Sequence, residues 1–166
     1  MDAKDWMDAT QNGFPWMAEC WNLARPMGSP GAGPKFHEPV IITRPEHVWV
    51  HPTARIDSFV KLEGGQGLWI GPMVHVASFC HIGAGGGEVI LDEACTTASH
   101  VVVVSGRSEY GLGKHPSPCH PDFTAKRWRT ILGKDAVVFA SAVVLGDVPE
   151  FGMVPAGTVH KQRRFP

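Results

Sequence analysis

Apolar residues recur at every sixth position over the last two-thirds of the chain, with small or polar residues between them. The repeat forms four groups of three, separated by slips at GGQG and AGGGE and by one long interruption. Its lead positions are Val50, Ile56, Leu62, Ile70, Val76, Ile82, Leu91, Thr97, Val103, Leu132, Val138 and Val144. A second column of small or aliphatic residues lies four positions later: Ala54, Val60, Val74, Cys80, Cys95, Val101, Ala136, Ala142 and Val148.

A period of six predicts short strands joined by tight corners, in which three strands make one coil of about 18 residues. Side chains alternate along a strand, so the lead residue and the residue four positions later both point inward. The sequence therefore predicts an all-β solenoid of about four coils over residues 48–166. Cys80 and Cys95 fall on the small inward column, which indicates buried core thiols rather than a redox centre.

The repeat is an aliphatic residue, then Gly, Ala, Glu or Asp, then a small residue three positions later. It resembles the hexapeptide repeat of the acyltransferase superfamily, whose members fold as left-handed parallel β-helices. HIGAGGGEVILDEACTTASHVVVVSG is similar to the middle coils of the sugar O-acetyltransferases, and AVVFASAVVLGDVPEFGMVPAGTVHKQ to their closing segment. The resemblance implies a homotrimer that binds acetyl-CoA between adjacent subunits and acetylates a sugar or another small hydroxyl acceptor.

The long interruption, residues 106–130, begins within the stretch VVVVSGRSEYGLGKHPSPCHPDF, after the third group. All three slips fall in the third step of a group, so we expect them to stack on one edge of the solenoid. A loop of this length in a compact domain is usually functional or disordered. The resemblance implies that the loop covers a neighbouring subunit and that a histidine at its root acts as the general base.

Ser108 stands where the resembling enzymes carry that histidine, at the end of the hexapeptide that enters the loop. Four candidates for the catalytic base therefore stay open: His100, Glu109, His115 and His120. His100 occupies an outward position on the coil before the loop and is the first choice. Glu109 can serve as a base only where it is desolvated.

Basic and aromatic residues after the loop are candidates for binding the phosphates and adenine of CoA. They are Arg127, Trp128, Arg129 and, near the C-terminus, Lys161. The γ-class carbonic anhydrases, which share the repeat, bind zinc through two coil-wall histidines with the spacing of His115 and His120. Prolines within and after this pair place it in an extended loop instead, so we expect no metal.

The first 47 residues lack the repeat. Apolar residues at positions 14, 17, 18 and 21 follow helical spacing, which predicts a short amphipathic helix over 14–24. The following stretch, ARPMGSPGAGPKFHEP, predicts an extended linker. We expect this region to cap the open end of the solenoid or to form an arm that docks on a neighbouring subunit or another protein.

The amino-acid composition indicates mainly which partners are not expected. Charged residues make up 19% of the chain and the net charge is −1, so there is no basic field for nucleic acid or an anionic membrane. The four cysteines form no close pair, which is typical of a cytoplasmic protein with reduced thiols. The alternative to an enzyme is a non-catalytic trimeric β-helix that lacks the catalytic histidine, such as a virion decoration or scaffold protein assembled in a particle.

Overall fold

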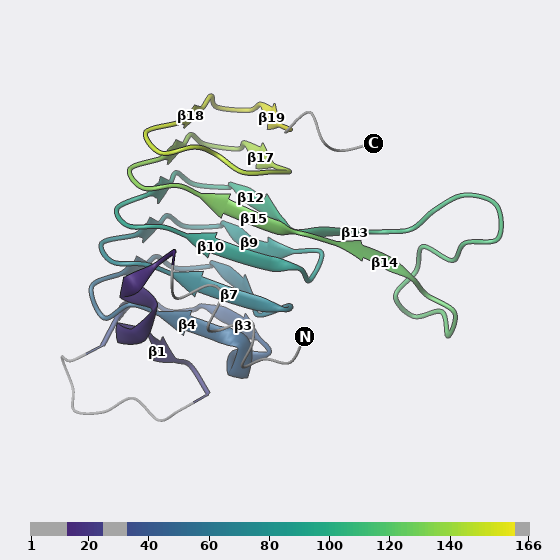
Figure 1. The fold of residues 1–166 in the computed structure, drawn as a ribbon, viewed down its shortest axis with the longest axis horizontal. Coiled ribbons are helices and arrows are strands. Elements are labelled where there is room, and N and C mark those ends of the chain that lie inside the picture. The colour runs from purple at the N-terminus through teal and green to yellow at the C-terminus, as the bar shows by residue number, and fades with distance from the viewer. Residues whose placement is uncertain (1–12, 25–32, 162–166) are drawn as a thin grey trace.

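The computed structural model describes residues 13–24 and 33–161; the remaining residues, including most of the predicted linker, lie outside the described residues. Within this range nearly all regular structure is strand. Three sheets form the walls of a prism, and each strand pairs with strands one coil before and one coil after it (Figure 1). The chain is a left-handed parallel β-helix, as the resemblance to the hexapeptide-repeat proteins implies.

The three walls are named here sheets A, B and C. Sheet A contains β1 (Trp21–Asn22), β4 (Val48–Val50), β7 (Gly67–Ile70), β10 (Glu88–Leu91) and β15 (Arg129–Leu132). Sheet B contains β2 (Lys35–Phe36), β5 (Arg55–Ile56), β8 (His75–Val76), β11 (Thr96–Thr97), β16 (Val137–Val138) and β18 (Met153–Val154). Sheet C contains β3 (Ile41–Thr43), β6 (Lys61–Glu63), β9 (His81–Ala84), β12 (Val102–Val104), β17 (Val143–Val144) and β19 (Val159–His160).

Two elements interrupt this pattern. The 3-10 helix η2 (Pro45–His47) leads into β4, and β13 (Gly106–Ser108) pairs with β14 (Ala125–Arg127) as an antiparallel ribbon. All strand pairs in the walls are parallel except β1 with β4.

Sheets B and C each have six strands, so the β-helix has about six coils rather than the predicted four. The four predicted groups are the second to fifth coils. The first coil consists of β2 and β3, within a segment that the sequence analysis assigned to the linker and arm. Only Phe36 and Ile42 continue the lead column there, which is too few to complete a group of three. The sixth coil, with β18 and β19, is the predicted closing segment.

The core is the interior of the prism. Every lead position and every member of the small column is buried, with at most 2% of its surface exposed. The expectation for Cys80 and Cys95 is confirmed, because both lie in this core. Burial raises the pKa of both thiols, which keeps them protonated and unreactive.

The N-terminal segment lies on the side of the prism (Figure 1). In place of the predicted α-helix over 14–24, the structure has the 3-10 helix η1 (Pro15–Glu19) followed by β1. Trp16 and Met17 are buried against the outer face of sheet A, where they contact Trp69. This part of the N-terminal segment therefore packs on the chain's own prism, while Ala18, another of the helically spaced residues, is exposed. Within the described residues, no helix is long and apolar enough to cross a membrane.

The three insertions stack on one edge of the prism, between sheets C and A, as the register predicts. The N–H of Gln66 donates to the carbonyl oxygen of Gly87, one coil further on, at 3.0 Å. The long loop leaves this edge after Ser105 and returns at Trp128, whose N–H donates to the Ser105 carbonyl oxygen at 2.8 Å. Between these points, β13 and β14 carry the loop away from the prism (Figure 1).

Gly87 lies where this edge is tightest. A Cβ at Gly87 would lie 2.0 Å from the carbonyl oxygen of Ser105 and 2.2 Å from that of Trp128. We expect Gly87→Ala to lower the free energy of unfolding by about 3 kcal/mol, because the backbone must shift to admit the methyl group. Urea unfolding measures this loss. Gly67→Ala is the matched control, since a Cβ there meets only side-chain atoms, at 3.5 Å or more. An equal loss in both variants would contradict this account.

Candidate functional site

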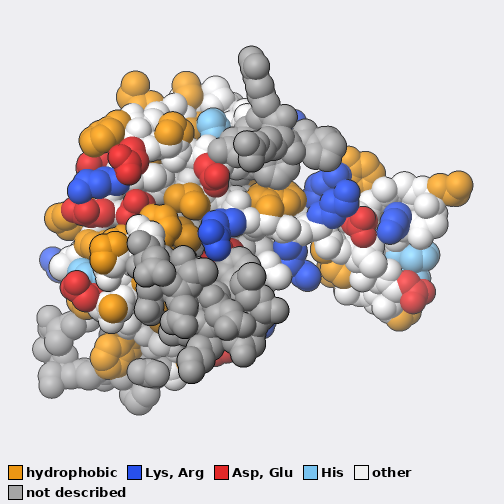
Figure 2. Space-filling view, in the orientation of Figure 1, with side chains coloured by type: hydrophobic (Ala, Val, Ile, Leu, Met, Phe, Trp, Pro, Cys, Tyr) orange, Lys and Arg blue, Asp and Glu red, His pale blue; other side chains and the backbone are white. Residues whose placement is uncertain are grey.

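Basic side chains gather where the long loop leaves the prism (Figure 2). Arg107 on β13 lies directly opposite Lys126 on β14, so two positive side chains project from the same face of the ribbon. The next residue, Arg127, projects from the other face. Among the described residues, no carboxylate forms a salt bridge with any of the three. Like charges in opposite positions destabilise a ribbon, so a bound anion would stabilise it here.

Arg127 lies over a corner made of glycines. Its Nε is 3.5 Å from the point where a Cβ of Gly86 would stand. Gly85 and Gly86 have φ of 94° and 74°, a region that favours glycine. With no side chain in the way, a phosphate held by the Arg127 guanidinium can approach the backbone of this corner.

The other predicted CoA-binding residues lie in three different settings. Arg129 forms an ion pair with the buried carboxylate of Glu88, and burial raises the pKa of Glu88 while Arg129 opposes that rise. Trp128 is half-buried at the loop root. Lys161 follows β19 and is exposed at the far end of sheet C. Arg127 and Trp128 are thus the two that lie beside the loop root.

The outer face of sheet C changes character along the prism. In the second and third coils it carries the polar residues Lys61, Glu63 and His81. In the fourth and fifth coils its outward side chains are aliphatic and half-buried: Val102, Val104, Val143 and Leu145. These four residues form what we call the aliphatic strip, which begins at the loop root.

His100 lies at the other end of the aliphatic strip, at the corner between sheets B and C. Its φ is 64°, and its ring stacks on Phe79 with 5.0 Å between centroids, as Phe79 stacks on Phe59. In the described chain, no group forms a hydrogen bond with its ring nitrogens. Six residues separate His100 from Gly106, roughly 20 Å along the wall. His100 is therefore outward, as predicted, but lies at the opposite end of the wall from the loop root.

Glu109 lies in the loop, just beyond the ribbon. Its carboxylate forms an ion pair with Lys114 Nζ at 3.5 Å. A hydrogen bond from Thr124, together with the charge of Lys114, holds the pKa of Glu109 below its ordinary value. A lowered pKa makes the carboxylate a weaker base. Ser108, at the position where a histidine was expected, pairs with Ala125 in the ribbon.

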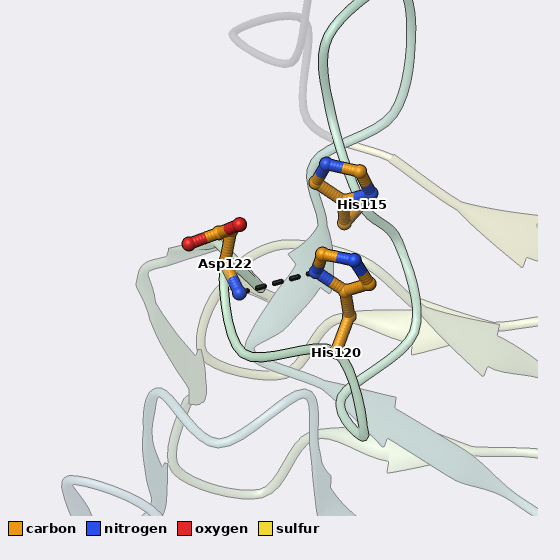
Figure 3. A group of neighbouring side chains, drawn as sticks. All are labelled: His115, His120 and Asp122. Carbon is orange, nitrogen blue, oxygen red and sulfur yellow. Dashed lines mark hydrogen bonds between the residues drawn. The ribbon is translucent and has the colours of Figure 1, made fainter.

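His115 and His120 lie together near the end of the loop. Their rings stack with 3.7 Å between centroids, and Asp122 lies beside them (Figure 3). The loop carries these residues away from its own prism (Figure 1). The structure therefore brings two of the four predicted bases together, but separates them from His100 within one chain.

Two carboxylate–imidazole pairs that the sequence analysis did not predict lie on the walls. His75 Nε2 is 2.8 Å from Asp57 Oδ2 on sheet B, and His81 Nε2 is 2.9 Å from Glu63 Oε1 on sheet C. In each pair the acid precedes the histidine by 18 residues, because it lies two positions after the residue that pairs with the histidine one coil earlier. This spacing within the repeat is the signal that could have revealed them. Each carboxylate orients its imidazole and joins two coils.

The Asp57 carboxylate also binds Arg55, whose Nε lies 2.7 Å from Oδ1. Burial raises the pKa of Asp57, but the hydrogen bonds and positive charges of His75 and Arg55 outweigh this effect and hold the pKa below its ordinary value. The ionised form of Asp57 therefore stabilises the folded chain.

The sequence matches no family model. A segment of 62 residues, 37% of this chain, is 36% identical to the acyl-(acyl-carrier-protein)–UDP-N-acetylglucosamine O-acyltransferase of Bartonella quintana (strain Toulouse). The match covers 18% of that protein, so this chain spans a small part of its length.

Solved structures of AntD, an N-acyltransferase from Bacillus cereus, have the same fold. A variant in complex with dTDP-4-amino-4,6-dideoxyglucose and coenzyme A has a TM-score of 0.70 and 20% identity, over 78% of this chain and 72% of AntD. The complex with dTDP and 3-hydroxybutyryl-CoA has a TM-score of 0.53 and 20% identity, over 75% and 71%. This chain thus has the hexapeptide-repeat β-helix fold of these acyltransferases.

Asp57→Asn tests the pair on sheet B. Because the folded-state pKa of Asp57 lies below its ordinary value of about 4, its contribution to stability is present above that pH and is lost as the pH falls through the folded-state value. We expect the variant to be less stable by about 1 kcal/mol at neutral pH, and we expect this difference to shrink as the pH falls below the ordinary pKa of Asp. Urea unfolding at each pH measures the difference. Exposed Glu150→Gln is the control, and a loss independent of pH would refute the expectation.

Proposed function

We propose that this chain is a CoA-dependent acyltransferase that transfers an acetyl group to a hydroxyl of a sugar or a similar small acceptor. One observation carries the proposal. The sheet C wall has a basic ribbon at one end, the aliphatic strip along it and the exposed His100 imidazole at the other end. Acyl-CoA presents matching chemistry in the same order: phosphates, an extended pantetheine arm and a reactive thioester.

The ribbon supplies the contacts that phosphates require. Arg127 offers a planar guanidinium above an open glycine corner, and Lys126 adds a second positive charge from the other face of the ribbon. The distance of roughly 20 Å from the loop root to His100 suits an extended pantetheine arm. Val102 and Val104 line this path with aliphatic carbon.

His100 acts as the general base in this proposal. One ring nitrogen of the neutral imidazole accepts the proton of the acceptor hydroxyl as its oxygen attacks the thioester carbonyl carbon. The C–S bond breaks when the tetrahedral intermediate collapses, and the imidazolium returns the proton to the CoA thiolate. The products are the acetyl ester and free CoA. The stack with Phe79 holds the plane of the ring. One base and aligned substrates suffice, so these steps need no metal.

A homotrimer completes the site in this proposal. Large apolar side chains on the outer walls of the last two coils are exposed: Phe139 by 44%, Met153 by 71% and Val159 by 56%. Closed threefold packing of the prisms would bury such side chains. The loop, which projects away from its own prism, then reaches the wall of the neighbouring copy. Acyl-CoA lies between that loop and the aliphatic strip.

The relatives support this choice of substrates. The Bartonella quintana protein is named for acyl transfer to an oxygen of UDP-N-acetylglucosamine. The AntD complexes contain coenzyme A or 3-hydroxybutyryl-CoA together with dTDP or a dTDP-sugar. Both proteins thus involve an acyl carrier and a nucleotide or nucleotide-sugar, which favours a thioester donor and a sugar acceptor here.

His100→Ala tests the base. We expect kcat for acetyl transfer to fall by about 100-fold or more, with little change in KM for acetyl-CoA, because the imidazole acts on the acceptor proton. The release of free CoA thiol, measured against a panel of sugar hydroxyl acceptors, reports the rate. His37→Ala removes another exposed histidine and should keep full activity. Full activity of His100→Ala would show that another group is the base.

The double variant Lys126→Ala/Arg127→Ala tests the phosphate contacts. We expect its Kd for acetyl-CoA to rise by about tenfold, because the Arg127 guanidinium over the glycine corner and a second positive charge of the ribbon are lost. Calorimetry measures the affinity. Acetyl-pantetheine, which lacks the nucleotide phosphates, is the matched ligand and should bind both proteins equally. An equal loss for both ligands would place the phosphates elsewhere.

One observation favours a second function. The loop root carries Ser108, held in the ribbon opposite Ala125, where a histidine would serve catalysis. A non-catalytic trimeric β-helix that acts in an assembly accounts for this. This structural function becomes the better proposal if the wild-type protein neither binds nor turns over acetyl-CoA.

A further inference from the structure

We infer that the tip of the long loop binds one divalent transition-metal ion through His115, His120 and Asp122. One ligand atom from each side chain lies within 4.8 Å of the others (Figure 3). The sequence analysis weighed the two histidines alone and expected no metal. The structure adds the carboxylate, and two imidazoles with one carboxylate suit Zn²⁺, Co²⁺ or Ni²⁺.

Local hydrogen bonds shape the side of the loop that carries two of these ligands. The N–H of His120 donates to the Ser117 carbonyl oxygen at 3.0 Å, and the N–H of Phe123 donates to the His120 carbonyl oxygen at 3.0 Å. The N–H of Asp122 donates to His120 Nδ1 at 3.1 Å. These bonds turn the chain so that the Asp122 carboxylate lies beside the ring of a residue only two positions earlier.

His115 enters from the other side of the loop and places its ring parallel to that of His120, with an interplanar angle of 6°. An imidazole binds a metal in the plane of its ring, so at least one ring turns out of the stack when the ion binds. The Asp122 N–H also occupies His120 Nδ1, which leaves the proton of the neutral ring on Nε2. Binding therefore displaces a hydrogen bond or a proton and weakens as the pH falls.

The surroundings of the cluster favour an ion. Residues 111–119 are exposed, so this part of the loop has no apolar core of its own, and a metal crosslink can order such a segment. Pro116, Pro118 and Pro121 restrict the chain beforehand, which lowers the entropy lost on binding. The ammonium of Lys114, the nearest cation in sequence, pairs with Glu109.

Titration of the full chain, stripped of metal with EDTA, with Co²⁺ tests the site. We expect one Co²⁺ per chain, seen as visible d–d absorption and confirmed by equilibrium dialysis. His115→Ala, His120→Ala and Asp122→Asn should each weaken binding by about tenfold or more, and His37→Ala should bind like the wild type. The proposal is overturned if the wild type shows no saturable binding, or if the ligand variants bind as tightly as it does.

A variant of Cys119, the residue before His120, tests whether a thiolate rather than the assigned side chains binds the metal. Cys119 is exposed and lies outside the cluster of converging atoms, so Cys119→Ser should bind Co²⁺ like the wild type, with no thiolate charge-transfer absorption. Loss of binding in this variant would overturn the assigned ligands.

Proteolysis supplies a second readout. The bond between Lys114 and His115 is exposed to trypsin, and Zn²⁺ should slow its cleavage in the wild type but not in Asp122→Asn. Equal protection of both proteins would overturn the site. Neither measurement involves acyl transfer, so the outcome is independent of the proposed enzymatic function.

Discussion

Backbone hydrogen bonding between successive coils is the constraint on which the rest of this structure depends. His81 N–H donates to the Val101 carbonyl oxygen at 2.9 Å, and Val102 N–H donates to that of Ala142 at 3.0 Å, so each strand is held from both sides. Because the walls must stay in register, extra residues leave only at a corner. All three insertions do so at the same edge. The wall between the basic ribbon and His100 keeps its parallel pairing for this reason, with one register shift between Val103 and Val104.

Most of the fold could be predicted from the sequence because the core residues follow a single period of six. The lead and small columns predicted every buried wall position they named. The first coil and the N-terminal segment could not be predicted in this way. Among the described residues, the first coil has only two short strands, and Trp16 and Met17 pack on a sheet whose outward residues, such as Trp69, do not belong to the repeat. Tertiary contacts with this sheet therefore decided the conformation, and the helical spacing of positions 14, 17, 18 and 21 did not.

The candidate site was predicted only where it follows the repeat. Arg127 and Trp128 adjoin the stack, so counting along the chain placed them at the loop root. The pairing of Asp57 with His75 joins two coils, and it appears only when residues are compared across the walls rather than along them. Asp122 meets His115 through turns of the loop itself. No period governs those turns, so the positions of these residues could not be predicted from the repeat.

The chain leaves the stack after Ser105 and rejoins it at Trp128, and β10 pairs with β15 in uninterrupted register. The two ends of the excursion are thus joined by the hydrogen bond from Trp128 N–H to the Ser105 carbonyl oxygen. Gly106 packs against the backbone of Gly85 and is restricted by that contact, but the loop beyond β13 and β14 belongs to none of the three walls. That part of the loop can change in length and composition while the wall strands keep their pairing. Selection can therefore alter what the loop recognises without altering the β-helix that carries it.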